Sequence, residues 1–293
     1  MNPANKTLLT HITYPAVMTA GITAHIVFMG WGLNVMLSTY LPILAGAALI
    51  TLTEHKLVYR GQWTGRKKDV IEDGIYMALI QIALPRIIMA GFSLYLLEIL
   101  RESETISLKF WPHDWNTGSQ VILMLLSADF FRYWLHRASH EWAYLWRLHA
   151  VHHSPHKLYW FNVGRFHPIE KCLQMLFDTI PFVLLGVGEQ VFALYLVFYS
   201  INGFFQHCNI ELKLGPLNYL ISGPELHRWH HSRLPEESNQ NYGNNLILWD
   251  LLFGTWFLPE TRQVGELGLT NRSYPMRFLD QLKAPFIKGL DKD

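Results

Sequence analysis

The stretch LHRASHEWAYLWRLHAVHHSPH, residues 135–156, decides what kind of fold this chain can have. Six histidines fall within its last 21 residues, at spacings of three and four. Side chains three and four residues apart share one face of an α-helix, so the pattern predicts helices that present several imidazoles to one centre. Pro155 is expected to end the second of these helices. The groups are His136 and His140, then His149, His152 and His153.

A second copy of the triplet lies about 75 residues further along, in LHRWHHSRLP at residues 226–235. It repeats the i, i+3, i+4 spacing and is again followed by a proline, which predicts two equivalent ligand helices. Eleven of the fifteen histidines lie between His136 and His231. A lone buried histidine is usually a hydrogen-bonded core residue, and we interpret His11, His25, His55 and His113 in that way. The repeated triplet is His227, His230 and His231.

These clusters predict a site for more than one metal ion. Imidazole binds zinc, copper, iron and nickel, so the ligand type alone leaves the metal open. Eight clustered histidines exceed the four ligands of a tetrahedral zinc site, and a pair of metals is the economical interpretation. Few carboxylates accompany the histidines, and an all-nitrogen shell suits metals that activate dioxygen.

The composition of the chain favours a membrane protein. Half of its 293 residues are apolar, 14% are aromatic and only 16% are charged, and the mean hydropathy is positive. A spanning helix needs roughly 20 mostly apolar residues. Such lengths occur at about 16–34, 35–53, 74–100 and 119–135, and a further apolar stretch at 173–205 is broken near Gly186 and predicts a hairpin. Pro85 predicts a kink in the third span.

The basic residues between the second and third spans give an orientation. Lys56, Arg60, Arg66, Lys67 and Lys68 lie in this loop, and the positive-inside rule places it in the cytoplasm. The polar segment 101–118 would then lie outside, and the histidine clusters would lie on the cytoplasmic side. We predict no removable signal peptide, because the N-terminus lacks a basic start, a short apolar core and a cleavage site.

The bulk charge and the cysteines name no partner. The net charge of +1 gives no general attraction to nucleic acid, so we expect no nucleic-acid partner. Cys172 and Cys208 are too few and too far apart for a disulfide framework, and we interpret them as small apolar side chains. The chain shows no dinucleotide-binding glycine motif, haem attachment site or four-cysteine cluster, so electrons for redox chemistry are expected from a separate donor.

The motifs HRASH, HAVHH and HRWHH resemble those of the fatty acid hydroxylase/sterol desaturase superfamily of membrane di-iron enzymes. The similarity covers roughly 127–259 and includes GRFHPIE, FFQHCNIEL and NYGNN. It implies two iron ions that use dioxygen and external electrons to hydroxylate or desaturate a lipid such as a sterol, fatty acyl chain, carotenoid or ether lipid. By this resemblance the metal ligands and catalytic residues are His136, His140, His149, His152, His153, His207, His227, His230 and His231.

Other residues near the motifs are weaker candidates. Some family members carry a histidine where this chain has Glu211, so Glu211 could ligate iron or face water. Metal-bound imidazoles usually donate their other N–H to a carboxylate or carbonyl, and Asp129 or Glu141 could accept it; a salt bridge between Asp129 and Arg132 is the plain alternative. His156 and His167 are second-tier ligands, and Asn241 and Asp250 are candidates for orienting ligands.

Together these observations predict an all-α integral membrane bundle, of about four spans plus a hydrophobic hairpin, with a cytoplasmic helical cap that holds a di-metal site. Residues 1–118 would form the N-terminal spans and 119–293 the catalytic region of one integrated domain. The predicted function is a membrane di-iron lipid hydroxylase or desaturase that needs an electron-transfer protein or other reductant. Two alternatives stay open: a di-zinc membrane hydrolase, and a metal transporter, which would place its ligands within the spans.

Overall fold

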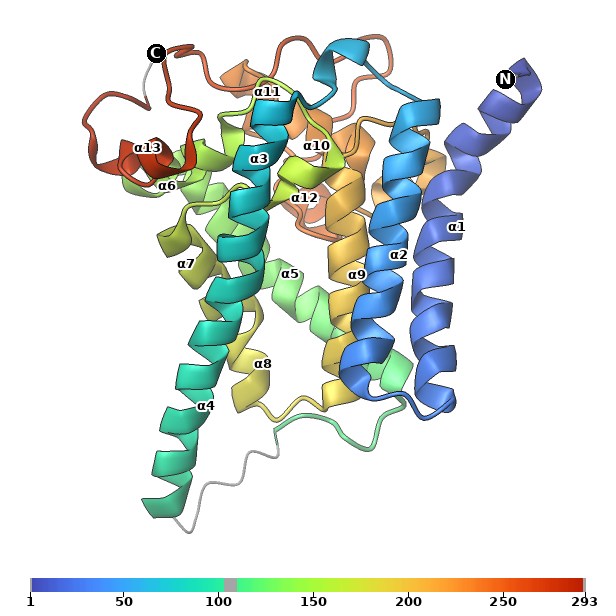
Figure 1. Cartoon of the computed structure of the whole chain (residues 1–293), viewed down its shortest axis with the longest axis vertical. Coiled ribbons are helices and arrows are strands. Elements are labelled where there is room, and N and C mark those ends of the chain that lie inside the picture. Colours follow the sequence, from blue (N-terminus) through green and yellow to red (C-terminus); the bar gives the residue numbers. More distant parts are fainter. Residues whose placement is uncertain (1, 103–109, 292–293) are drawn as a thin grey trace.

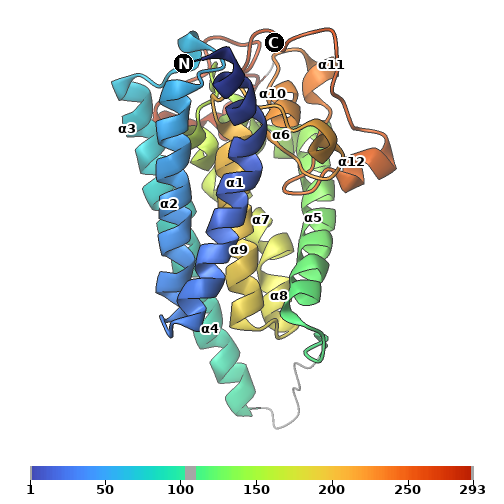
Figure 2. The same ribbon diagram turned by 90° about the vertical axis from the view of Figure 1, so that its right-hand side faces the viewer.

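The structure is a computed structural model that describes residues 2–102 and 110–291. Its long helices run side by side, and a layer of short helices and loops covers one end of them (Figures 1 and 2). Within the described residues there is no β-strand beyond three isolated bridges, so the predicted all-α class is confirmed. Both ends of the described chain lie on the covered side (Figure 1).

The first two long helices form the predicted hairpin. Helix α1 begins at Pro3, well before the predicted start near residue 16, because Asn2 caps it and its first turns are helical although they are polar and exposed. Gly21 of α1 and Gly46 of α2 both face Ile201 of α9, where a Cβ would come within 2.4 Å and 3.1 Å of the isoleucine side chain. These glycines therefore allow α9 to pack closely. The bounds are α1 Pro3–Gly30, α2 Val35–Lys56 and α9 Glu189–His207.

The third long helix is continuous but irregular. It consists of α3 (Lys67–Tyr76), a π-helical segment η2 (Met77–Ala83) and α4 (Leu84–Glu102). Pro85 lacks the backbone N–H that a regular helix would use, and the π-helical turns lie directly before it. The helix is therefore irregular before Pro85, and the predicted kink stays a prediction. Part of the predicted outer segment 101–118, residues 103–109, lies outside the described residues.

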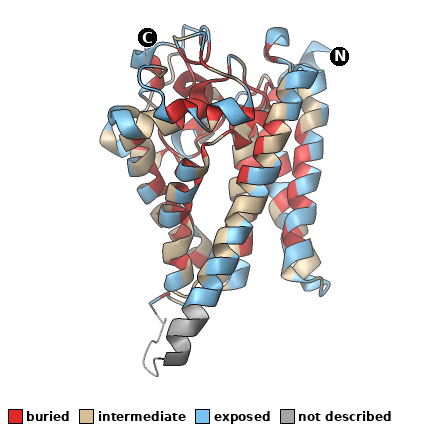
Figure 3. Ribbon diagram, turned by 60° about the vertical axis from the view of Figure 1, so that its left-hand side comes forward, coloured by how far each residue is buried: buried red, intermediate tan, exposed pale blue. Residues whose placement is uncertain are grey.

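Three described helices are long and apolar enough to cross a membrane: Pro3–Gly30, Val35–Lys56 and Lys67–Tyr95. Apolar side chains on their outer faces, such as Leu44, Leu52 and Ile87, are 59–69% exposed, and Figure 3 shows exposed residues along these helices. Helix α5 (Thr117–Glu141) contains the predicted fourth span, but polar and charged residues interrupt its apolar face. These helices identify a membrane protein.

Most of the shorter elements build the covering layer, whose interior is mostly buried (Figure 3), whereas α8 lies at the opposite end of the long helices (Figure 1). The apolar region at 173–205 is broken at Gly186, which has a positive φ of 79°, and so forms the predicted hairpin from α7, α8 and α9. The remaining elements are η1 Gly61–Trp63, α6 Ala143–His153, η3 Trp160–Gly164, α7 Pro168–Asp178, α8 Ile180–Leu184, η4 Gly215–Tyr219, α10 Pro224–His230, α11 Pro235–Ser238, α12 Leu248–Phe253, α13 Phe278–Gln281 and η5 Ala284–Phe286.

Candidate metal centre

The histidines that the sequence singles out come together in two groups in the covering layer. Each histidine in a group offers one ring nitrogen as a possible ligand, and these nitrogens all lie within 4.8 Å of one another. All nine predicted ligands belong to one group or the other. The first group is His136, His140, His149, His153 and His230, and the second group is His152, His207, His227 and His231.

Four helices supply these side chains. The chain turns sharply at Trp142, which ends α5 and begins α6, and this turn brings the histidines of both helices together. Helix α6 ends at His153, just before Pro155, as predicted. Helix α10 carries the repeated triplet at its C-terminal end, and α9 ends on His207. Because the members of each triplet alternate between the two groups, both triplet helices contribute to both groups.

The two groups touch each other. The rings of His153 and His231, one from each group, are stacked with centroids 4.4 Å apart. The rings of His149 and His152 lie 5.3 Å apart across the same boundary. The geometry therefore suits two neighbouring metal ions better than two separate sites.

Burial keeps these imidazoles neutral. Loss of solvent, reinforced by the neighbouring imidazoles, lowers the pKa of His149, His152 and His153 well below its usual value. The pKa of His230 falls to about 4, chiefly because of burial. Neutral imidazole has a free lone pair and is the form that binds metals, so the cluster is prepared to act as a set of ligands at neutral pH.

The spacing of the nitrogen atoms fits bound metals. Nε2 of His149 lies 3.0 Å from Nε2 of His136 and 3.1 Å from Nε2 of His153. Two nitrogens bound at right angles to one metal, at the usual zinc–imidazole length of about 2.1 Å, lie about 3.0 Å apart. Nε2 of His140 and Nε2 of His207 are buried without any hydrogen-bond partner. A metal ion would satisfy these atoms, and the residues present fit one.

In the first group, acceptors outside the cluster hold the outward nitrogen of four imidazoles. The Nδ1–H groups donate to acceptors of three kinds: a carboxylate, an amide and backbone carbonyls. Each bond fixes the ring and leaves Nε2 pointing inward. The pairs are His149 to Glu170 Oε1 at 2.6 Å, His140 to Asn239 Oδ1 at 2.9 Å, His136 to the Tyr242 carbonyl at 2.8 Å and His230 to the Gln240 carbonyl at 2.8 Å.

The second group has fewer such bonds. Nδ1 of His207 donates to Asn162 Oδ1 at 2.8 Å, and Nδ1 of His152 lies 3.3 Å from the Arg165 carbonyl. Nδ1 of His227 and Nδ1 of His231 are buried without a partner. All four members are fully buried. Packing, more than hydrogen bonding, holds this group in place.

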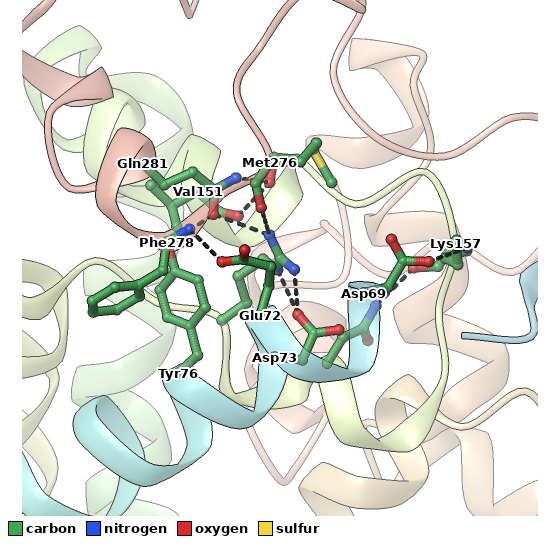
Figure 4. Close-up of polar contacts among 12 residues, drawn as sticks. Asp69, Glu72, Asp73, Tyr76, Val151, Lys157, Met276, Phe278 and Gln281 are labelled. Carbon is green, nitrogen blue, oxygen red and sulfur yellow. Dashed lines mark hydrogen bonds and ion pairs between the residues drawn. The ribbon is translucent and has the colours of Figure 1, made fainter. Parts of the chain in front are cut away.

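A buried ion pair supports Arg165, whose carbonyl faces His152. The Arg165 guanidinium contacts Asp73 of α3 and donates to Gln281 Oε1 at 3.1 Å. Gln281 Oε1 also accepts from the Tyr76 hydroxyl at 2.7 Å. Figure 4 shows this network joining α3 to the C-terminal segment. The third long helix is thereby tied to the second histidine group.

Hydrogen bonds also hold the loop 239–246 in place. They involve Asp129, Asp250 and Asn241, which we predicted as residues that orient the metal ligands. Asp129 accepts from the backbone of Asn245 and Leu246, and Asp250 accepts from the backbone N–H groups of Tyr242 and Gly243 at 2.7 Å each. Asn241, with a φ of +56°, bonds the Phe257 backbone. Among the described residues, none of these three side chains has a hydrogen bond to a histidine; they hold the loop whose Gln240 and Tyr242 carbonyls accept from histidines.

Several candidates are not brought to the cluster. Glu211 forms an ion pair with Lys6 at 2.7 Å near the surface, and Glu141 pairs with Arg137. His156 is exposed. The Nδ1 atom of His167 instead caps α7 by accepting from the Ile169 N–H. The expected alternative of an Asp129–Arg132 ion pair is also wrong, because Arg132 faces Asp178 at 3.7 Å.

Sequence reasoning missed Glu170, Asn162 and Asn239 as partners of histidines. Glu170 lies in GRFHPIE, one of the stretches that resemble the superfamily. Its signal was present: a carboxylate three residues after His167 in a stretch that resembles the superfamily. The two asparagines have no such signal, since their contacts span 45 and 99 residues of sequence.

Both histidine groups open onto one cavity of about 590 Å³. His136 and His149 of the first group and His152, His207 and His227 of the second group line it. Much of its remaining wall is apolar, from α2, η2, α4, α7 and α9. This is the arrangement expected for a site that accepts an apolar molecule beside bound metal.

Comparison with known proteins points in one direction. Residues 121–255 match the family described as fatty acid hydroxylase. The chain is 34% identical over 286 residues to the ornithine lipid hydroxylase OlsE of Rhizobium tropici, covering 95% of this chain and 84% of that protein.

Two other kinds of relative match over shorter stretches. An alkylglycerol monooxygenase of Xenopus tropicalis is 34% identical over 154 residues, which are 53% of this chain and 33% of that protein. The very-long-chain aldehyde decarbonylase GL1-8 of Oryza sativa subsp. indica is 33% identical over 149 residues, 49% of this chain and 54% of that protein. No solved structure gives a significant match.

Proposed function

The chain belongs to the fatty acid hydroxylase/sterol desaturase superfamily, and from that premise we propose that it is a membrane-bound di-iron oxygenase acting on a lipid. It uses dioxygen and external electrons to hydroxylate or desaturate a C–H bond. Relatives named as a lipid hydroxylase and a monooxygenase support an oxidoreductase with a lipid substrate.

One observation carries this proposal: nine imidazoles form two touching groups, and five of them line a largely apolar cavity. We assign all nine histidines as ligands and the two groups as two iron positions. An all-imidazole donor set is compatible with iron. Bound iron would supply the activation of dioxygen, which no side chain can perform.

The protein's own groups prepare the site. Glu170 and the carbonyls of Tyr242 and Gln240 accept the Nδ1–H of their histidines, so Nε2 keeps its lone pair for metal. The apolar wall excludes bulk water and holds a hydrocarbon chain beside the cluster. The buried position of both groups limits access to molecules that enter through this cavity.

The topology is part of the proposal. Four spans, α1, α2, α3 to α4 and α5, with the α7 to α9 hairpin between cap segments, would place the cap and both ends of the described chain in the cytoplasm. The basic loop between α2 and α3 lies on the cap side (Figure 2), which supports this orientation. Residues 1–118 and 119–293 would form one integrated unit, supported by the bond from Tyr14 of α1 to Asn202 of α9 at 2.7 Å.

Cysteine labelling in right-side-out membrane vesicles tests this orientation. Gly61→Cys lies at the cap end and Asp114→Cys at the opposite end, and both positions are exposed. In a Cys172→Ser background, which removes the exposed native cysteine, a membrane-impermeant maleimide should label Asp114→Cys and not Gly61→Cys. The reverse pattern would refute the cytoplasmic placement.

Lipid profiling tests the activity. Cells that express the chain should contain a lipid that has gained one oxygen or lost two hydrogens, and cells that express His152→Ala should lack it. The proposal requires a separate electron-transfer protein. The host should therefore supply such a protein itself or express a reductase together with the chain. A product that forms equally with His152→Ala would contradict the assignment.

A further inference from the structure

The cavity beside the histidines is mostly apolar, but one part of its wall is strongly polar. Charged side chains from α5 and α7 lie together there, one helical turn from the metal cluster. Arg132 precedes His136 by four residues on α5, which places it about 6 Å along the helix axis. The charged residues that line the cavity wall near Arg132 are Glu170, Lys171 and Asp178.

Arg132 is buried with most of its hydrogen-bonding capacity unused. Its side chain is 8% exposed, and both Nε and Nη1 lack a hydrogen-bond partner. Nη2 has one long bond to Asn244 Oδ1 at 3.4 Å, and Asp178 Oδ2 lies 3.7 Å from Nε, beyond hydrogen-bond distance. A guanidinium taken out of water needs acceptors, because burial without them is costly. The two free nitrogens therefore mark a position for an oxygen acceptor.

Within the described part of the chain, neither of the two cations on this wall has a hydrogen-bonded carboxylate partner. Lys171 is 6% exposed and lines the same wall, and it forms no ion pair within residues 2–102 and 110–291. Glu170 is committed to His149 at 2.6 Å. Asp178 accepts from the Thr179 hydroxyl at 2.8 Å and comes no closer than 3.7 Å to Arg132 Nε, so among the described residues neither cation has a hydrogen bond to a carboxylate.

Further unpartnered polar atoms surround this position. The Tyr195 hydroxyl, Gln174 Oε1 and Asn244 Nδ2 are buried without hydrogen bonds, and all three residues line the cavity. Natural proteins satisfy nearly all buried polar atoms, so several orphans at one place indicate a missing ligand.

We propose that Arg132, with Lys171, binds the anionic oxygen group of a lipid headgroup inside this cavity. A carboxylate or a phosphate would serve, since both accept paired N–H donors from a guanidinium. Because Arg132 lies one turn from His136, the oxidised carbon lies within a few bonds of the headgroup and not far along the hydrocarbon chain. This regiochemistry rests on the proposed oxygenase function, whereas the binding of the headgroup does not.

Binding to the full-length protein in detergent micelles tests the subsite without turnover. The probes are oleate, oleyl phosphate and oleyl alcohol, which share a chain and differ in the headgroup. The native protein should bind at least one of the two anions about tenfold or more tightly than the alcohol, as expected for charge-assisted hydrogen bonds. Whichever anion binds more tightly identifies the headgroup. Equal affinity for all three probes would overturn the proposal.

Arg132→Gln should remove this preference while leaving the affinity for oleyl alcohol and the metal content unchanged. Arg132→Lys should keep part of it. If Arg132→Gln fails to fold, Lys171→Gln takes its place and should reduce the preference severalfold. A preference that survives in the folded variants would overturn the assignment. Anion binding that persists in a protein without oxygenase activity would contradict the proposed function and leave the subsite intact.

Discussion

The two histidine groups lie in contact yet are held by different means. In the first group, four of five imidazoles donate Nδ1–H to a named acceptor, and two members are only partly buried. In the second group, two of four imidazoles have such a contact, and all four are buried. The first group is therefore oriented by hydrogen bonds and the second by packing and by the network around Arg165.

The two groups should differ in their response to substitutions around them. A group oriented by single hydrogen bonds should respond to the loss of one acceptor, whereas a group oriented by packing should respond to changes in the surrounding helices. The ligands themselves should matter equally in both groups. Substitutions of a ligand, of a hydrogen-bond acceptor and of a residue in the surrounding network separate these effects.

The largest effect is expected from replacing one ligand in each group. His149→Ala and His152→Ala each remove a metal-binding nitrogen, so turnover should become undetectable, and the iron content should fall from two per chain to about one or less. Elemental analysis and lipid product formation measure the two effects. Full activity in either variant would remove that histidine from the ligand set.

The next effect separates the groups. Glu170→Gln weakens the acceptor of His149, and loss of such an outer partner typically lowers metal affinity or activity by about 10–100-fold. The control is Glu141→Gln, because Glu141 is a surface carboxylate paired with Arg137. Metal titration should show the loss in Glu170→Gln alone. Equal behaviour of the two variants would show that hydrogen bonding does not orient the first group.

A third substitution acts on the second group through its surroundings. Asp73→Asn leaves the Arg165 guanidinium buried without its counter-charge, which should lower the free energy of unfolding by about 3–5 kcal/mol. Asp69→Asn is the matched control on the same helix, since its ion pair with Lys157 is partly exposed and should cost about 1 kcal/mol. Thermal unfolding in detergent compares them. A loss of stability no greater in Asp73→Asn would contradict the role of this network.

The smallest effect is expected at Glu211. Its ion pair with Lys6 joins side chains that are 38% and 50% exposed, so Glu211→Gln should change stability by less than about 1 kcal/mol. Iron content should stay unchanged. A drop in iron content in this variant would return Glu211 to the coordination shell.

Features that depend on residues close together in the sequence could be predicted, whereas contacts between distant residues could not. The histidine triplets were legible because ligands on one helix face repeat at three and four residues, a local pattern. The Tyr242 carbonyl that holds His136 is 106 residues away, and a backbone carbonyl carries no residue-type signal at all. The break at Gly186 was predictable because it arises from a single residue's backbone chemistry. Proline at position 85 indicated a disturbed helix for the same reason, but not the π-helical turns that lie before it.

Predictions were wrong where the surroundings of a residue in the fold, and not its type, decide its role. Helix α1 starts at Pro3 because capping by Asn2 suffices, although its first turns are not apolar. Asp129 and Asp250 accept hydrogen bonds from the backbone of the loop 239–246 and not from an imidazole. The spacing of Arg132 and Asp129 on one helix indicated an ion pair between them, but the Arg132 side chain lines the cavity instead.

The metal content of the anaerobically purified protein tests the central claim most directly. Elemental analysis should find two iron ions per chain and little zinc, and His149→Ala prepared in parallel should lose iron. Two zinc ions per chain without iron would contradict the assignment of a di-iron oxygenase.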